Sequence, residues 1–109
     1  MTALESNIVK TIKAGLLKEA ARLVHTIEIR KRHGTAYSIK GDPDLYGVIN
    51  YSPEAGGLGR HFEIEVKRPG EEPTPLQCQR IQEWKNAGSL AGWATNFEEA
   101  KRILWPPHL

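Results

Sequence analysis

The segment His61-Phe62-Glu63-Ile64-Glu65-Val66-Lys67 alternates strictly between polar and apolar residues. Successive side chains of a β-strand point to opposite faces, so this period of two predicts a strand with one buried face. The apolar set, Phe62, Ile64 and Val66, is expected to face the core. Glu63, Glu65 and Lys67 then share the opposite face, where the ordinary interpretation is that their charges are exposed to water.

The remaining elements follow from apolar spacing, capping patterns and breakers. Thr2 with Glu5 and Thr74 with Gln77 have the form of capping boxes, and Gly88 is placed as a helix stop. In chain order we expect a helix through residues 4–23, strands over 24–29, 45–51 and 61–67, a helix from Pro75 to Gly88, a strand over 90–94 and a helix from Asn96 to Trp105. The order α-β-β-β-α-β-α predicts an α/β fold in which helices flank a mixed central sheet.

Composition limits what such a domain can do. The 109 residues suit one domain, 1–109, and the single cysteine excludes an internal disulfide framework. No apolar run approaches membrane-span length and no signal peptide is recognisable, so we expect a cytoplasmic protein without a membrane partner. The formal net charge of +2 conceals a basic first part, residues 1–40, and an acidic remainder. That division suits either a polyanion-binding face beside a cation site or two solvated surfaces.

Asp44 gives the acidic part of the chain a candidate cation-binding site. It opens the strand over 45–51 directly after Pro43, and if that strand pairs with the one over 61–67, Asp44 lies beside Glu65. Two carboxylates and a nearby main-chain carbonyl form an oxygen-rich site suited to Mg²⁺ or Mn²⁺. Lys67 would lie about 6–7 Å along the strand from Glu65. The alternative for Asp44 is an ordinary turn aspartate.

Other candidate features are less specific. The basic run that ends at His33 is the best candidate for phosphate-backbone contact, with a solvated strand end as the alternative. The histidines have no zinc-ligand spacing, and Gly56-Gly57-Leu58-Gly59 lacks the form of a nucleotide phosphate loop, so neither zinc nor a nucleotide cofactor is expected. Trp84 and Trp93 lie in apolar patterns and are expected in the core.

Several of these residues match one family. Gly41-Asp42-Pro43-Asp44 followed by Glu65-Val66-Lys67 resembles the signature of PD-(D/E)XK nucleases, and the rest of the chain resembles their VRR-NUC branch, of the stand-alone virus or phage type. Three further stretches carry the resemblance: Glu5-Ser6, Thr74-Pro75-Leu76-Gln77 and Gly88-Ser89-Leu90-Ala91-Gly92. The fold it implies is a restriction-endonuclease-like core.

The resemblance also implies site roles. Asp44 and Glu65 would bind the metal with the Val66 carbonyl, and Glu5 would complete the acidic cluster. Lys67 would orient or deprotonate the attacking water, and Gln77 would position Lys67 or a phosphate oxygen. Asp42, an addition to the motif, competes with Asp44 as a ligand. The DNA-binding candidates are Arg30, Lys31, Arg32, Lys40 and Arg68.

The activity implied is that of a Mg²⁺- or Mn²⁺-dependent, structure-selective endodeoxyribonuclease. Virus-type members of the family resolve four-way (Holliday) junctions as homodimers, so branched DNA and a second copy are the expected partners. If the chain is phage-encoded, its compartment is the cytoplasm of a bacterial host. The alternatives are a non-catalytic DNA-binding or assembly module of nuclease fold, and a nuclease that acts on flaps or simple duplex DNA.

Overall fold

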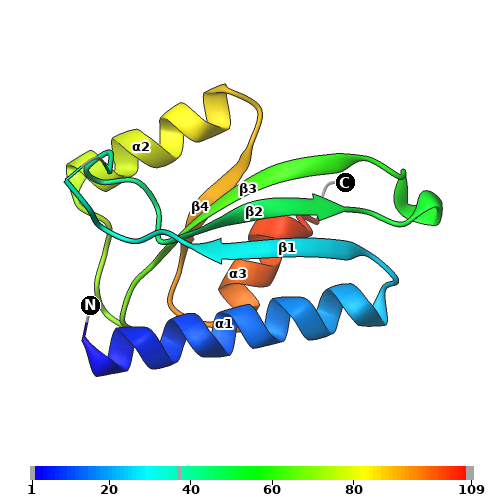
Figure 1. The fold of residues 1–109 in the computed structure, drawn as a ribbon, viewed down its shortest axis with the longest axis horizontal. Helices are drawn as coiled ribbons and strands as arrows, with labels where there is room; N and C mark the ends of the chain where they lie inside the picture. The colour runs from blue at the N-terminus through cyan, green and yellow to red at the C-terminus, as the bar shows by residue number, and fades with distance from the viewer. Residues whose placement is uncertain (1, 37, 108–109) are drawn as a thin grey trace.

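The computed structural model describes residues 2–36 and 38–107, which form a four-stranded sheet with three α-helices (Figure 1). The elements are α1 (Ala3–Arg22), β1 (Thr26–Lys31), β2 (Leu45–Asn50), a 3-10 turn (Pro53–Ala55), β3 (Gly59–Val66), α2 (Pro75–Asn86), β4 (Leu90–Ala94) and α3 (Phe97–Leu104). The sheet order is β1-β2-β3-β4; the first three strands are antiparallel, and β4 runs parallel to β3. The predicted α/β element order and mixed sheet are confirmed.

The two faces of the sheet are covered differently. Helices α1 and α3 pack on one face, where they enclose the core with the inward residues of the strands, as Figure 1 shows. That core contains Val9, Ile12, Leu16, Ile29, Leu45, Ile49, Phe62, Ile64, Val66, Leu90, Ala94, Ala100 and Leu104. Helix α2 lies over the opposite face, near the end of the sheet where β2 begins and β3 ends. The second face is therefore open beside α2.

The two later helices begin where their capping residues predict. The Thr74 side chain accepts a hydrogen bond from the Gln77 N–H, and the Gln77 side chain accepts one from the Thr74 N–H, which closes the expected capping box. Gly88 has φ of +101° immediately after α2, as a left-handed C′ residue should. Asn96 caps α3 through the Glu99 N–H.

Strand β1 begins at Thr26, two residues later than the expected start at Val24. Val24 instead takes φ of +60° in the turn that ends α1, and the His25 N–H donates to the Ala20 carbonyl. A β-branched residue rarely adopts this conformation, so the turn carries a local strain that the apolar pattern does not reveal.

Helices α1 and α3 approach each other closely at Gly15. A Cβ atom at that position would lie 2.4 Å from Cδ1 of Phe97, the first residue of α3. The glycine that weakens the helix pattern therefore makes room for an aromatic ring between two helices. In the part of the chain that the structure describes, no helix has both the length and the apolar character needed to cross a membrane.

Candidate active site

The pairing of β2 with β3 brings Asp44 to Glu65. Leu45 is opposite Ile64 in the antiparallel register, so the preceding residue, Asp44, falls level with Glu65. The Val66 N–H donates a hydrogen bond of 2.9 Å to Oδ2 of Asp44. This juxtaposition is the one that the strand pattern predicts, and it is present in the structure.

Glu65 is almost completely buried, with 4% of its surface exposed. Burial is the largest cause that raises its pKa to about 9, and the neighbouring charge of Asp44 and a hydrogen bond with that side chain raise it further. The ammonium of Lys67 opposes this rise. At neutral pH the carboxyl of Glu65 therefore keeps its proton when no cation is beside it.

Glu5 contributes a charge to this region without joining a metal-binding group. It adds the smallest of the effects that raise the pKa of Glu65. Its own carboxylate accepts from the Thr2 hydroxyl and lies 3.8 Å from Nε of Arg68. Across residues 2–36 and 38–107, no three Asp, Glu, His or Cys side chains are grouped closely enough to hold a metal ion. In the described residues Glu5 is held by its helix cap and by Arg68, and it is not grouped with Asp44 and Glu65.

Gln77 serves the helix and the site together. Its Oε1 accepts from the Thr74 N–H at 2.9 Å, and its Nε2 donates to Oε1 of Glu65 at 3.3 Å. The expected partners were Lys67 or a phosphate oxygen, whereas the structure pairs the amide with Glu65. Capping and contact with the carboxylate, treated as alternatives in the sequence, are compatible because they use different atoms of one side chain.

Asp42, the expected competitor of Asp44, has a different neighbour. Its Oδ1 accepts a hydrogen bond of 3.2 Å from the indole N–H of Trp84 on α2. Asp44, and not Asp42, is bonded next to Glu65. The Asp-Pro-Asp turn thus directs its first carboxylate to α2 and its second to β3.

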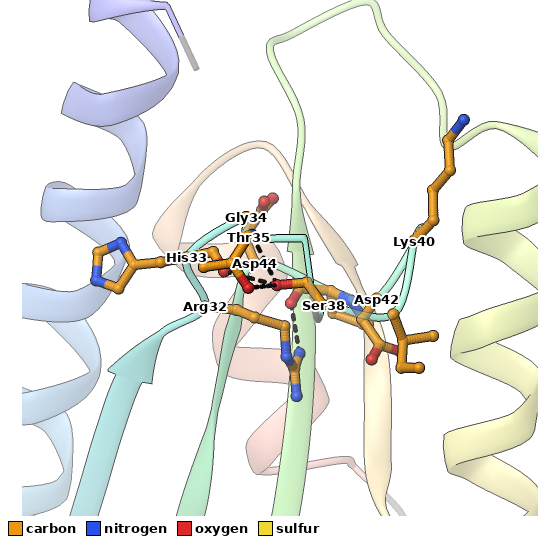
Figure 2. A pocket seen from close by; sticks show the side chains of 11 residues that line it. Arg32, His33, Gly34, Thr35, Ser38, Lys40, Asp42 and Asp44 are labelled. Carbon is orange, nitrogen blue, oxygen red and sulfur yellow. Dashed lines mark hydrogen bonds between the residues drawn. The ribbon is translucent and has the colours of Figure 1, made fainter.

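A pocket of about 410 Å³ opens beside Asp44 and is formed by residues 32–35 and 38–44 of the segment between β1 and β2. Figure 2 shows Arg32, Asp42 and Asp44 on its wall, with the Lys40 side chain extending away from them. The Ser38 hydroxyl donates to the His33 carbonyl at 2.9 Å and so closes the turn at the rim. Asp44 lines this pocket, whereas Glu65, Lys67 and Gln77 do not, so the pocket adjoins the site without containing it.

The five DNA-binding candidates differ in whether they form ion pairs within the protein. Arg30 is paired with exposed Glu28 at 2.7 Å, and Arg68 with Glu71. Lys31 and Lys40 form no ion pair with the residues described. Arg32 lies against Glu63, with 23% of its side chain exposed, so its guanidinium is already occupied within the protein.

Two residues beside the site differ from their expected placement. Glu63 has no exposed surface, although the alternating pattern suggested a solvated charge. It is bound by Arg32, which lies 31 residues earlier in the chain. Trp93, expected in the core, is 40% exposed. It pairs with Glu65 in the parallel register of β3 and β4, so both side chains project from the same face.

These features define a class of protein: a mixed α/β domain of restriction-endonuclease-like topology with a carboxylate pair at the adjoining ends of β2 and β3. Comparison with protein-family models finds no match, and comparison with curated proteins finds none. Among solved structures, one described as "VRR_NUC domain" matches with a TM-score of 0.60 and 19% identity, covering 97% of this chain and 99% of that chain. Another, described as "VRR_NUC domain protein", gives a TM-score of 0.52 and 18% identity, covering 87% and 85%. The chain has the VRR-NUC fold, and the resemblance is confirmed at that level.

Replacing Glu65 with glutamine should change how stability depends on pH. The carboxyl ionises near 4.5 in the unfolded chain but near 9 in the folded one, so folded Glu65 retains a proton across this window. The contribution of Glu65 to wild-type stability therefore falls as pH rises from 4.5 towards about 9. We expect Glu65→Gln to unfold with a free energy on the order of 2 kcal/mol higher than wild type near pH 8, and with no gain below pH 4.5.

Urea denaturation of both proteins across this range measures the effect. Glu72→Gln changes an exposed glutamate and should follow the wild-type curve. Parallel curves for Glu65→Gln and wild type would contradict the assigned environment.

Proposed function

We propose that this protein is a divalent-metal-dependent endodeoxyribonuclease. The observation that carries the proposal is the juxtaposition of Asp44 and buried Glu65 at the adjoining ends of two paired strands. Ionising both carboxyl groups beside each other, one of them buried, is unfavourable, and a carboxyl perturbed in this way is typical of sites that bind a cation or catalyse a reaction. The nuclease fold shared with VRR_NUC domains supports the same reading.

The donor set fits a hard cation. Glu65 holds a proton that a cation would replace, and Asp44 supplies the second carboxylate. The Val66 carbonyl is the proposed third ligand, and water would fill the positions that a third carboxylate from Glu5 would otherwise take. When bound, Mg²⁺ or Mn²⁺ would polarise the scissile phosphate and acidify water.

Lys67 and Gln77 complete the proposed machinery. The Lys67 ammonium is near enough to Glu65 to lower its pKa, so it would also lie near a phosphate that reaches this carboxylate. There the ammonium would orient the attacking water and stabilise negative charge that develops on the phosphate oxygens, whereas deprotonating that water would require the neutral amine. Gln77 holds the Glu65 carboxyl in place from α2 and so fixes one side of the site.

DNA would approach over the open part of the sheet face. Arg30, opposite Tyr46 in the register, lies on this face and could exchange its carboxylate partner for a phosphate, and exposed Lys40 is available beside it. Lys31 is opposite Leu45 and so projects from the core-facing side, and Arg68 lies beside Glu5 of α1, so these two would serve only DNA that extends past the sheet edge. Trp93 offers an exposed aromatic ring next to Glu65, and such a ring stacks on a base that has left its duplex. This favours branched or locally unpaired DNA over continuous duplex.

A four-way junction is the substrate we propose first. Each chain carries one Asp44–Glu65 pair, so symmetric cleavage of two strands requires two copies related by a two-fold axis. A homodimer on branched DNA would provide this arrangement. Cleavage of flaps or plain duplex, and DNA binding without turnover, are the alternatives that experiment distinguishes.

Removing either carboxylate or the lysine should abolish cleavage and spare binding. We expect Asp44→Asn, Glu65→Gln and Lys67→Ala each to lower kcat by about 100-fold or more, because each removes a group placed at the reacting phosphate. Synthetic four-way junctions, flaps and linear duplex, each incubated with Mn²⁺, provide the rates. Gel shifts in Ca²⁺ provide the affinity, which should change little. Lys85→Ala, an exposed lysine on α2, serves as the matched control.

The outcomes separate the alternatives. Paired nicks in opposite strands of the junction, made by a dimer in sedimentation, support the proposal. Equal cutting of all three substrates would exclude a structure-selective nuclease. If wild type binds DNA but shows no metal-dependent cutting, the alternative of a non-catalytic DNA-binding module is supported instead.

The metal proposal has a test that requires no cleavage. Mn²⁺ should raise the Tm of wild type, since a ligand of the folded state alone stabilises it. The rise should be greater near pH 8.5 than near pH 6.5, because Glu65 must release its proton to bind. Differential scanning fluorimetry with and without EDTA measures this. Asp44→Asn should lose the shift, and an unchanged shift in that variant would place the metal elsewhere.

Trp93 should govern the choice among DNA structures. We expect Trp93→Ala to lower the ratio of kcat/KM on junction to kcat/KM on duplex by about tenfold, since base–aromatic stacking contributes roughly 1–3 kcal/mol. Trp93→Phe should retain most of the preference. Steady-state kinetics on both substrates measure the ratio, and an unaltered ratio in the alanine variant would exclude stacking by this residue.

A further inference from the structure

Glu63 is a buried carboxylate that the proposed reaction does not use. It lies two residues before Glu65 on the same face of β3, and none of its surface is exposed. Arg32 donates to both of its oxygens, at 2.7 Å to Oε1 and 3.3 Å to Oε2, and Nε2 of His61 contacts Oε2 as well. Its polar atoms are therefore satisfied inside the protein.

Arg32 connects this carboxylate to the Asp-Pro-Asp turn. The guanidinium Nη1 that binds Glu63 also donates to the Pro43 carbonyl at 2.6 Å, a bond drawn in Figure 2. The main-chain N–H of Arg32 donates to the Asp44 carbonyl at 2.7 Å. One residue thus holds the backbone on both sides of the bond between Pro43 and Asp44.

Aromatic rings hold the guanidinium in its plane. Its central carbon lies 4.4 Å from the ring centroid of Tyr46 and 5.9 Å from that of Trp84. Trp84 stacks on His61 and donates to Asp42, so α2 also reaches the first carboxylate of the turn. A lysine ammonium could not bind Glu63 in this two-bonded manner or stack its plane on an aromatic ring.

A buried ion pair contributes little net stability, because the free energy of removing both charges from water offsets their attraction. In some proteins such a pair instead specifies one arrangement of the groups around it. Here the arrangement specified is that of the turn, which carries the carboxylate that must meet Glu65.

We propose that Arg32 and Glu63 are positioning residues: their ion pair holds the Asp-Pro-Asp turn so that the Asp44 carboxylate meets Glu65 and the Val66 N–H. The inference rests on the proposed nuclease site, since it assigns a purpose to the placement of Asp44. Arg32 is then part of the internal structure of the site and not a contact to DNA phosphate.

Arg32→Lys and Glu63→Gln test this in the intact protein. In both variants the hydrogen exchange of the Val66 amide, measured by NMR, should accelerate about tenfold or more, while amides in the centre of β3 keep their protection. Cleavage of junction DNA should lose roughly 100-fold in kcat with little change in affinity, because a carboxylate displaced by about 1 Å is misplaced for the reaction. Arg22→Lys is the matched control, since Arg22 makes an equivalent two-bonded pair with Glu19 on the exposed end of α1.

The two measurements fail separately. If wild type cleaves no DNA, the nuclease proposal fails, and Val66 exchange alone then decides whether the pair holds the turn. Unchanged Val66 exchange in both variants overturns the inference, whatever the rates. So does a uniform loss of protection throughout β3, which would indicate general destabilisation. Weaker DNA binding in Arg32→Lys with a normal rate in Glu63→Gln would return Arg32 to the DNA interface.

Discussion

The antiparallel register between β2 and β3 is the constraint on which the site depends. Leu45 and Ile49 must face the core, and a shift by one residue would turn both outwards. The same register that buries them sets Asp44 level with Glu65. The parallel register of β4 then places Trp93 next to Glu65 on the open face. The proposed chemistry is thus positioned by hydrophobic packing on the opposite side of the sheet.

The features that could be predicted from the sequence are those formed by residues close together in the chain. The capping box of Thr74 and Gln77 and the left-handed Gly88 are local, so α2 is found where its capping residues indicate. The meeting of Asp44 with Glu65 needs only one strand pairing beyond that. The predicted start of β1 at Val24 was wrong because Val24 adopts a positive φ, which β-branched residues rarely do.

The burial of Glu63 could not be predicted from the alternation of polar and apolar residues. Its partners are Arg32, just after β1, and His61 on β3, and Trp84 on α2 stacks on His61. An alternating strand predicts which side chains share a face, but not what covers that face. Arg32 shows the converse limit: it belongs to a basic run, yet its guanidinium forms an ion pair with a buried carboxylate. The positive surface is therefore smaller than the charge count of residues 1–40 indicates.

Glu63 and Glu65 are two buried carboxylates on one strand face with opposite environments. Glu63 has a guanidinium that cannot be deprotonated, so its charge is compensated permanently. Glu65 has a neutral amide from Gln77 and a second carboxyl group from Asp44, and the Lys67 ammonium offsets them only in part, so the ionised form of Glu65 is poorly compensated. If the fold were selected only for stability, Glu65 would be expected to have a cationic partner as Glu63 does, because an unpaired buried carboxylate is destabilising. The difference between them is the physical reason to place a cation at Glu65 and a structural role at Glu63.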